Sequence, residues 1–206
     1  RHVFGKVGID TMAGPSEVLV IADKDNNADW LAADLLAQAE HDVAAQSILI
    51  TDDVDFAFAV EEAIERQLVT LARAEIASQS WEDHGGIILV GDLNDAPALA
   101  NRIAAEHVEL AIADPEAMLP LIRNAGAIFL GAHTPEVIGD YVGGSNHVLP
   151  TARAARYSSG LSVLDFAKRT SILKLGRDQL QALAPAAMEL ATAEGLGGHR
   201  RSVAIR

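Results

Sequence analysis

Short apolar runs alternate with longer amphipathic stretches over the first 130 residues. The apolar runs are rich in Val, Ile and Leu, which is typical of strands buried on both faces; they cover residues 18–21, 47–51, 86–90, 108–112 and 127–130. The stretches between them predict helices over residues 28–41, 52–80 and 95–105, and a further helix that begins at Asp114-Pro115. This alternation predicts an α/β fold, an incomplete Rossmann-like parallel sheet with helices on both faces.

The pattern changes after Gly131. Residues 139–160 are rich in Gly, Ser, Asn and Pro and predict a long loop of the kind that often carries function. A helical segment over 164–170, a strand-like segment over 171–175, a helix over 178–194 and a Gly-rich end follow. We therefore expect a Rossmann-like domain over 1–160 that holds the site, and a small C-terminal helical arm over 161–206.

Composition narrows the function classes. No apolar run in the 206 residues approaches the roughly 18 residues that a membrane span needs. A net charge of −13 disfavours binding to nucleic-acid phosphates. The absence of Cys excludes thiolate nucleophiles and Cys-based zinc sites, so nitrogen and oxygen would have to hold any metal. The sequence shows no secretory signal, and we expect a cytoplasmic protein.

A search for phosphate-binding loops finds none. The sequence has no Gly-x-Gly-x-x-Gly and no Walker loop, and the first expected strand ends in Ala22-Asp23-Lys24-Asp25. That end carries two carboxylates where a dinucleotide phosphate would sit on a glycine-rich turn. We therefore assign no cofactor-binding residue to this chain.

Gln38 and His41 are three residues apart near the end of an expected helix, so both side chains lie on one face. An amide oxygen and an imidazole nitrogen on one face could bind a divalent metal. The alternative is a helix C-terminus in which His41 interacts with the last carbonyl groups. Spacing alone leaves both readings open.

Glu106 and His107 come directly before an expected strand. A His is the usual general base near neutral pH, and a Glu can activate water. Neighbouring residues in a strand face opposite ways, so the two could share a pocket only at its rim. From the residues alone, a turn with an exposed acid and a half-buried His is the favoured interpretation.

Asp140, Asn146 and His147 lie in or beside the Gly-rich loop. We place this loop near the carboxyl side of the sheet, where the sites of α/β proteins usually form. Polar groups on such a loop are stronger functional candidates than charges on a solvated helix.

Three further polar residues stand at element boundaries. Ser16 begins an expected strand, where its hydroxyl could bind a ligand or close the turn. Glu194 and His199 bracket the Gly-rich tail, for which a flexible end is the structural alternative.

Five segments resemble, in order, the histidinol dehydrogenase family. They are Ile9-Asp10-Thr11-Met12-Ala13-Gly14-Pro15-Ser16-Glu17-Val18, Gln38-Ala39-Glu40-His41, Ala105-Glu106-His107-Val108-Glu109, Gly144-Ser145-Asn146-His147-Val148-Leu149-Pro150-Thr151, and Glu194-Gly195-Leu196 with His199. The resemblance covers essentially all 206 residues. One departure is Ser145, where a Pro is common in the family, and we expect little effect from it.

The resemblance implies the oxidation of L-histidinol through an aldehyde to L-histidine, the last step of histidine biosynthesis, with two NAD molecules and one zinc ion per site. It implies roles for nine residues: zinc ligands Gln38, His41, Asp140 and His199; substrate-binding residues Ser16, His147 and Glu194, together with the zinc ligands and His107; and catalytic residues Glu106 and His107. His107 would take protons in each oxidation, and Glu106 would activate the water that attacks the aldehyde.

The resemblance also implies a homodimer in which Glu194 and His199 act on the partner subunit's site. Family members are roughly twice as long as this chain, so we expect the missing N-terminal half to bind most of the NAD. Two alternatives remain: a catalytically silent zinc- or ligand-binding fragment, and a dehydrogenase of the same scaffold that acts on another small amino alcohol or diol.

Overall fold

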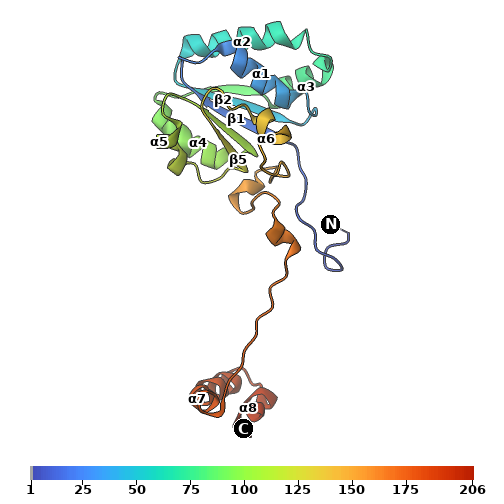
Figure 1. The fold of residues 1–206 in the computed structure, drawn as a ribbon, viewed down its shortest axis with the longest axis vertical. Helices are drawn as coiled ribbons and strands as arrows, with labels where there is room; N and C mark the ends of the chain where they lie inside the picture. The colour runs from blue at the N-terminus through green and yellow to red at the C-terminus, as the bar shows by residue number, and fades with distance from the viewer. Residues whose placement is uncertain (1) are drawn as a thin grey trace. The chain divides into compact units, whose positions relative to one another are not determined.

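The computed structural model describes residues 2–206, which form two compact units, residues 2–166 and 167–206. The first unit contains a parallel sheet of five strands, in the order β3-β2-β1-β4-β5 (Figure 1). The strands are β1 (Glu17–Ala22), β2 (Gln46–Thr51), β3 (Gly86–Leu89), β4 (His107–Ala111) and β5 (Ala127–Leu130). The prediction of an α/β fold with a parallel sheet is confirmed.

Helices cover both faces of the sheet (Figure 1). On one face α1 (Ala28–Ala39), α2 (Val54–Leu68) and α3 (Ala74–His84) pack over Val18 and Val20. On the other, α4 (Ala96–Ile103) and α5 (Pro115–Met118) pack near Leu19 and Ile21. Successive residues of β1 thus enter opposite cores, which explains why its sequence is apolar throughout. Full burial of one such side chain contributes about 1.5–3 kcal/mol.

The single helix predicted over residues 52–80 is wrong, because the structure has two helices there. α2 ends at Leu68 and α3 begins at Ala74. The Thr70 hydroxyl donates to the backbone oxygen of Gln67 at 2.7 Å, which closes the end of α2 in a turn. Leu68 and Leu71 pack against the core at this break. The apolar periodicity carries through the turn, so the pattern alone does not reveal it.

Shorter helices shape the connections. The sequence pattern did not predict α6 (Glu136–Tyr141), which begins ahead of the Gly-rich segment. In the described part of the chain, four 3-10 helices cover residues Leu93–Asp95, Leu119–Leu121, Ala154–Arg156 and Val163–Phe166. As the Asp114-Pro115 pair predicts, the Asp114 carboxylate accepts the Ala117 backbone N–H at 3.1 Å and caps α5.

The second unit is a pair of helices, α7 (Arg177–Ala193) and α8 (Gly197–Ala204), joined by a turn with Gly195 at φ +70°. The Gly-rich tail is thus helical. The strand predicted over 171–175 is wrong, because residues 167–176 form no regular secondary structure and no strand of the described chain pairs with them. The helix expected over 164–170 is reduced to the 3-10 turn at Val163–Phe166. None of the helices found between residues 2 and 206 is long and apolar enough to cross a membrane.

Candidate active site

Seven of the nine predicted site residues line one cavity of about 270 Å³ in the first unit. They come from distant parts of the sequence: Ser16, Gln38, His41, Glu106, His107, Asp140 and His147. Thr11, Ala13, Val148, Leu149 and Thr151 complete the wall. The fold therefore gathers most of the predicted polar residues around one space.

The cavity lies at the amino edge of the strands. Ser16 directly precedes β1, and His107 is the first residue of β4. A crossover helix runs back against the strands, so the end of α1 brings Gln38, in its last turn, and His41, two residues after the helix, to the same edge. The expectation that Asp140 and its loop lie at the carboxyl side of the sheet is therefore wrong.

Side-chain hydrogen bonds bridge the carboxyl edge between β1 and β4. The Asn26 amide nitrogen donates to the Asp23 carboxylate at 2.8 Å and to the backbone oxygen of Ala111 at 2.5 Å. The other Asp23 oxygen accepts the Ala113 backbone N–H at 2.7 Å. In doubly wound sheets a nucleotide usually enters the crevice where the strand order reverses. Here that position, between β1 and β4, holds a carboxylate instead of a glycine-rich turn.

Glu106 and His107 meet at the rim of the sheet, and both are buried, at 5% and 4% exposure. One Glu106 carboxylate oxygen, Oε2, lies 3.9 Å from His107 Nδ1 and accepts the Glu17 backbone N–H at 3.3 Å. The Ser16 side chain also hydrogen-bonds to this carboxyl group. Burial nevertheless raises the pKa of Glu106 to about 7. The interpretation of an exposed acid beside a half-buried His is wrong, because the acid is buried beside the imidazole.

Acceptor oxygens surround the His107 ring. Nδ1 lies 3.2 Å from the backbone oxygen of Glu17 and 3.2 Å from Glu136 Oε2, and Nε2 lies 3.5 Å from Asp140 Oδ1. Burial lowers the pKa of His107, although the neighbouring carboxylate of Asp140 partly opposes that effect. A buried imidazole held neutral in a cavity is suited to accept a proton.

Sequence reasoning missed a group of carboxyl groups near the cavity: Asp34, which is half-buried, and Glu109 and Glu136, which are buried. Burial raises the pKa of Asp34 to about 6, of Glu109 to about 8 and of Glu136 to about 9, and the nearby acids add to the effect on the two Glu residues. One signal was present, because His107 and Glu109 alternate with apolar residues in a strand that is buried along its whole length. Polar side chains repeated on one face of such a strand indicate a polar site within the core.

Three groups on the cavity wall could bind a metal: the Gln38 amide, the His41 imidazole and the Asp140 carboxylate. Gln38 is 1% exposed, and its Nε2 has no hydrogen-bond partner among the described residues. The Nε2 group can only donate a hydrogen bond, so a metal ion would be bound by the amide oxygen of Gln38, with Nε2 left to face another ligand in the cavity. Within residues 2–206, no cluster of three or more His, Cys, Asp or Glu side chains is arranged to hold a metal ion.

The loop residues Asn146 and His147 have different environments. His147 lines the cavity. The Asn146 side chain accepts the Val148 backbone N–H at 2.9 Å and donates to the Leu161 backbone oxygen at 2.9 Å. Asn146 therefore ties the loop together, whereas His147 faces the site.

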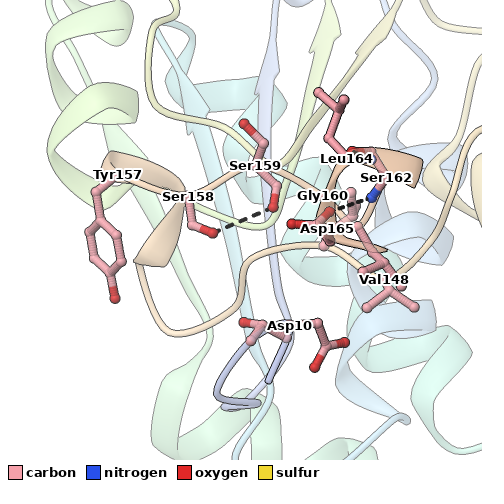
Figure 2. Close-up of a pocket in the computed structure, with 12 residues that line it drawn as sticks. Asp10, Val148, Tyr157, Ser158, Ser159, Gly160, Ser162, Leu164 and Asp165 are labelled. Carbon is pink, nitrogen blue, oxygen red and sulfur yellow. Dashed lines mark hydrogen bonds between the residues drawn. The ribbon is translucent and has the colours of Figure 1, made fainter. Parts of the chain in front are cut away.

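A second cavity, of about 310 Å³, shares Thr11, Val148 and Leu149 with the first. Figure 2 shows it between the N-terminal segment around Asp10 and the serine-rich turn that follows Tyr157. Its polar groups are partly used within the turn, where the Asp165 carboxylate accepts the Ser162 backbone N–H at 2.7 Å. Buried ionisable groups are typical of reactive sites, and they line the first cavity, so we assign the chemistry there.

The remaining predicted residues, Glu194 and His199, lie on the second unit. Both are exposed and line a groove between α7 and α8. The structure thus places seven of the predicted residues together in the first unit and the other two together in the second.

Comparison with known proteins gives a consistent result. The family model of histidinol dehydrogenase matches residues 1–206. Histidinol dehydrogenase from Brucella abortus (strain 2308) is 73% identical over the whole chain, which covers 48% of that protein, and the one from Rhizobium meliloti (strain 1021) is 72% identical with the same coverage.

Among solved structures, the crystal structure of histidinol dehydrogenase from Elizabethkingia anophelis superposes with a TM-score of 0.88 at 41% identity. That match covers 97% of this chain and 46% of the other. The chain therefore spans about half the length of the relatives it matches. Because the family model covers every residue, the chain belongs to the histidinol dehydrogenase family.

Proposed function

We propose that the full-length protein containing this chain oxidises L-histidinol to L-histidine through the aldehyde, with two NAD molecules and one zinc ion per site. The observation that carries the proposal is the single cavity into which Gln38, His41, Glu106, His107 and Asp140 converge. This convergence occurs in a chain that matches the family along its whole length.

His107 is the proposed proton acceptor. Its ring is buried and its Nε2 has no hydrogen-bond partner in the described structure, so that nitrogen is available to a substrate hydroxyl in the cavity. In each oxidation the hydroxyl O–H bond breaks and an Nε2–H bond forms, while the carbon releases a hydride. The lowered pKa keeps the imidazole unprotonated before each step.

Glu106 is proposed to activate water for attack on the aldehyde. Its carboxyl group has a pKa raised to about 7, so near neutral pH it changes protonation state easily. Ser16 and the Glu17 backbone N–H hold the carboxyl group by hydrogen bonds. Ser16, His147 and Glu194 are the proposed substrate-binding residues, together with His107 and the metal ligands.

The donor set suits zinc. Gln38, His41 and Asp140 supply oxygen and nitrogen, and His199 is the proposed fourth ligand. When bound, zinc would act as a Lewis acid that anchors the amine and imidazole of the substrate. The proposed acceptor of the hydride is NAD, which we assign mainly to the N-terminal half of the full-length protein.

We further propose that the protein is a homodimer, in which Glu194 and His199 serve the site of the partner subunit. Charge supports this arrangement. Residues 1–166 carry 26 acidic and nine basic side chains, a formal charge of −17, whereas residues 167–206 carry three acidic and seven basic ones, a charge of +4. A basic helical pair is attracted to the acidic surface of a second copy. A cytoplasmic location stays a prediction.

Metal content tests the ligand assignment. In the full-length protein, His41→Ala should lower bound zinc well below one ion per subunit, as measured by elemental analysis. His84 is the matched control, because it is exposed and also lies near the end of a helix. His84→Ala should retain zinc, and equal zinc content in the two variants would refute the assignment.

Turnover tests the substrate. The full-length protein should reduce NAD with L-histidinol and produce L-histidine. Assays with a panel of other small amino alcohols and diols test whether the protein instead prefers another substrate, as a dehydrogenase of the same scaffold would. Preference for another alcohol would reject L-histidinol as the substrate.

A second candidate is a silent zinc- or ligand-binding role for the 206-residue chain by itself. The bridged crevice at Asp23 and Asn26 favours this, because it leaves no phosphate-binding turn at the usual nucleotide position of the sheet. Calorimetric titration of the isolated chain with NAD should show no tight binding, and tight binding would contradict this role.

A further inference from the structure

The short helix α6 holds the His107 ring from one side. Glu136 and Asp140 are four residues apart on this helix, so their carboxyl groups lie on the same face one turn apart. Glu136 Oε2 lies 3.2 Å from Nδ1, and Asp140 Oδ1 lies 3.5 Å from Nε2. One helical turn thus places one carboxyl group at each nitrogen of the same imidazole.

The surroundings of Nδ1 determine where the ring carries its proton. Two oxygens face Nδ1 at 3.2 Å, the Glu17 backbone oxygen and Glu136 Oε2. A backbone carbonyl oxygen can only accept a hydrogen bond, so Nδ1 must carry the hydrogen. In the neutral ring Nε2 is then the unprotonated nitrogen; Asp140 Oδ1 lies 3.5 Å from it without forming a hydrogen bond. The Glu17 backbone oxygen is the acceptor of the Nδ1–H, whereas Glu136 Oε2 makes no hydrogen bond within residues 2–206 and lies against Nδ1 as a buried, unpaired oxygen.

Glu136 is itself held firmly. Its backbone N–H donates to Glu109 Oε1 at 2.8 Å, and Glu109 lies on β4 two residues after His107. Gly139 on the same helix packs directly on Phe129 of β5, where a Cβ atom would approach the ring to 2.5 Å. The absence of a side chain at Gly139 lets α6 lie close enough to the sheet for Glu136 to reach His107.

The burial of the Glu136 carboxyl group lowers the stability of the fold, which suggests that the residue has a function. The residue is 5% exposed, and the only positively chargeable partner that the described structure gives it is His107. A buried carboxyl group without a permanent cation destabilises a fold. The chemistry proposed for the cavity uses Glu106, His107 and Asp140 but gives Glu136 no task.

We propose that Glu136 is the positioning residue for His107: it holds the imidazole with Nδ1 protonated, so that Nε2 faces the cavity as the proton acceptor. This inference rests on the proposed function in one respect, the role of His107 as base. Glu136 touches no reacting atom and acts through the orientation of the ring.

Two substitutions in the full-length protein separate the acceptor oxygen from other properties of the side chain. Glu136→Met removes the carboxyl oxygen that lies against Nδ1 and roughly keeps the volume, and it should lower kcat for L-histidinol about 100-fold, with KM and zinc content nearly unchanged. Glu136→Gln keeps an acceptor oxygen and should retain most of kcat. Glu116 is the matched control, because Pro115-Glu116 begins α5 as Pro135-Glu136 begins α6, yet Glu116 is exposed. Glu116→Met should behave as the wild type.

A spectroscopic measurement tests the inference without activity. Imidazole ¹⁵N chemical shifts of the full-length protein, labelled in histidine and assigned with His107→Asn, distinguish a protonated from a bare ring nitrogen. We expect the neutral His107 of the wild type to carry its hydrogen on Nδ1, and the Glu136→Met variant to show partial loss of this preference.

The outcomes separate the two claims. A wild-type ring protonated on Nε2, or an unchanged kcat in a folded Glu136→Met variant of an active enzyme, would overturn the inference. Failure of the wild-type protein to oxidise L-histidinol would instead refute the proposed function, while the ring tautomer would still decide the position of the proton.

Discussion

Replacing Glu109 by Gln should reduce the loss of stability that the protein suffers at alkaline pH. Glu109 is 4% exposed, shares a hydrogen bond with Asp34 and accepts the Glu136 backbone N–H. Burial raises its pKa from 4.5 to about 8. Between these values the folded protein keeps a proton that the unfolded chain has lost, so the stabilisation is complete below pH 4.5 and is lost as the pH rises through 8.

The size of the effect follows from the same two pKa values. Between the two pKa values, the free energy of unfolding falls by roughly 1.4 kcal/mol for each pH unit. Glu109 alone should therefore lower the free energy of unfolding by about 3 kcal/mol between pH 6 and pH 9. Gln has nearly the same shape and keeps the oxygen that accepts the Glu136 N–H, but it does not titrate. Glu109→Gln should therefore lose about 3 kcal/mol less than the wild type over this range.

Urea unfolding of the full-length protein at several pH values, followed by circular dichroism, measures this difference. Glu116→Gln, an exposed substitution of the same kind, should keep the wild-type pH dependence. Asp34 and Glu136 also have raised pKa values, so part of the pH dependence should remain in Glu109→Gln. Equal losses in the wild type and Glu109→Gln would refute the reasoning that Glu109 is a buried carboxyl group that stays protonated in the folded state.

Two further predictions concern close packing and the bridged edge of the sheet. Gly139→Ala places a Cβ atom 2.5 Å from the Phe129 ring and should lower the free energy of unfolding by about 1–3 kcal/mol, measured by thermal unfolding. The control Gly8→Ala, with no atom within 4 Å of its Cβ, should lower it far less, and equal losses would count against the close approach of α6. Asn26→Ala removes the hydrogen bonds to Asp23 and Ala111 and should cost about 1–3 kcal/mol of unfolding free energy, and a neutral result would show that this bridge does not stabilise the sheet.

The sequence pattern was sufficient to predict the sheet, because strands buried on both faces are apolar throughout and stand out from amphipathic helices. It failed to predict helix boundaries where the apolar periodicity continues through a turn of the chain. The apolar periodicity from residue 52 to 80 continues through the turn at Thr70, and α6 is too short to show a period. The segment over 171–175 has strand-like residues, but a strand forms only where a neighbour can pair with it.

For the site, long motifs revealed which residues matter, but local spacing did not reveal how they meet. Adjacent positions argued against a shared pocket for Glu106 and His107, yet the two side chains meet because Glu106 lies just before β4 begins. The position of the cavity at the amino edge depends on where α1 and α6 end, which local patterns do not determine. Glu136 escaped notice because only the tertiary fold brings it to His107.

The most direct test of the account is the oxidation of L-histidinol by the full-length protein and its His107→Asn variant, with zinc content measured on the same samples. The account predicts NAD reduction by the wild type, loss of turnover in His107→Asn and equal zinc in both. Normal turnover in a folded, zinc-loaded His107→Asn variant would contradict the assignment of His107 as the base.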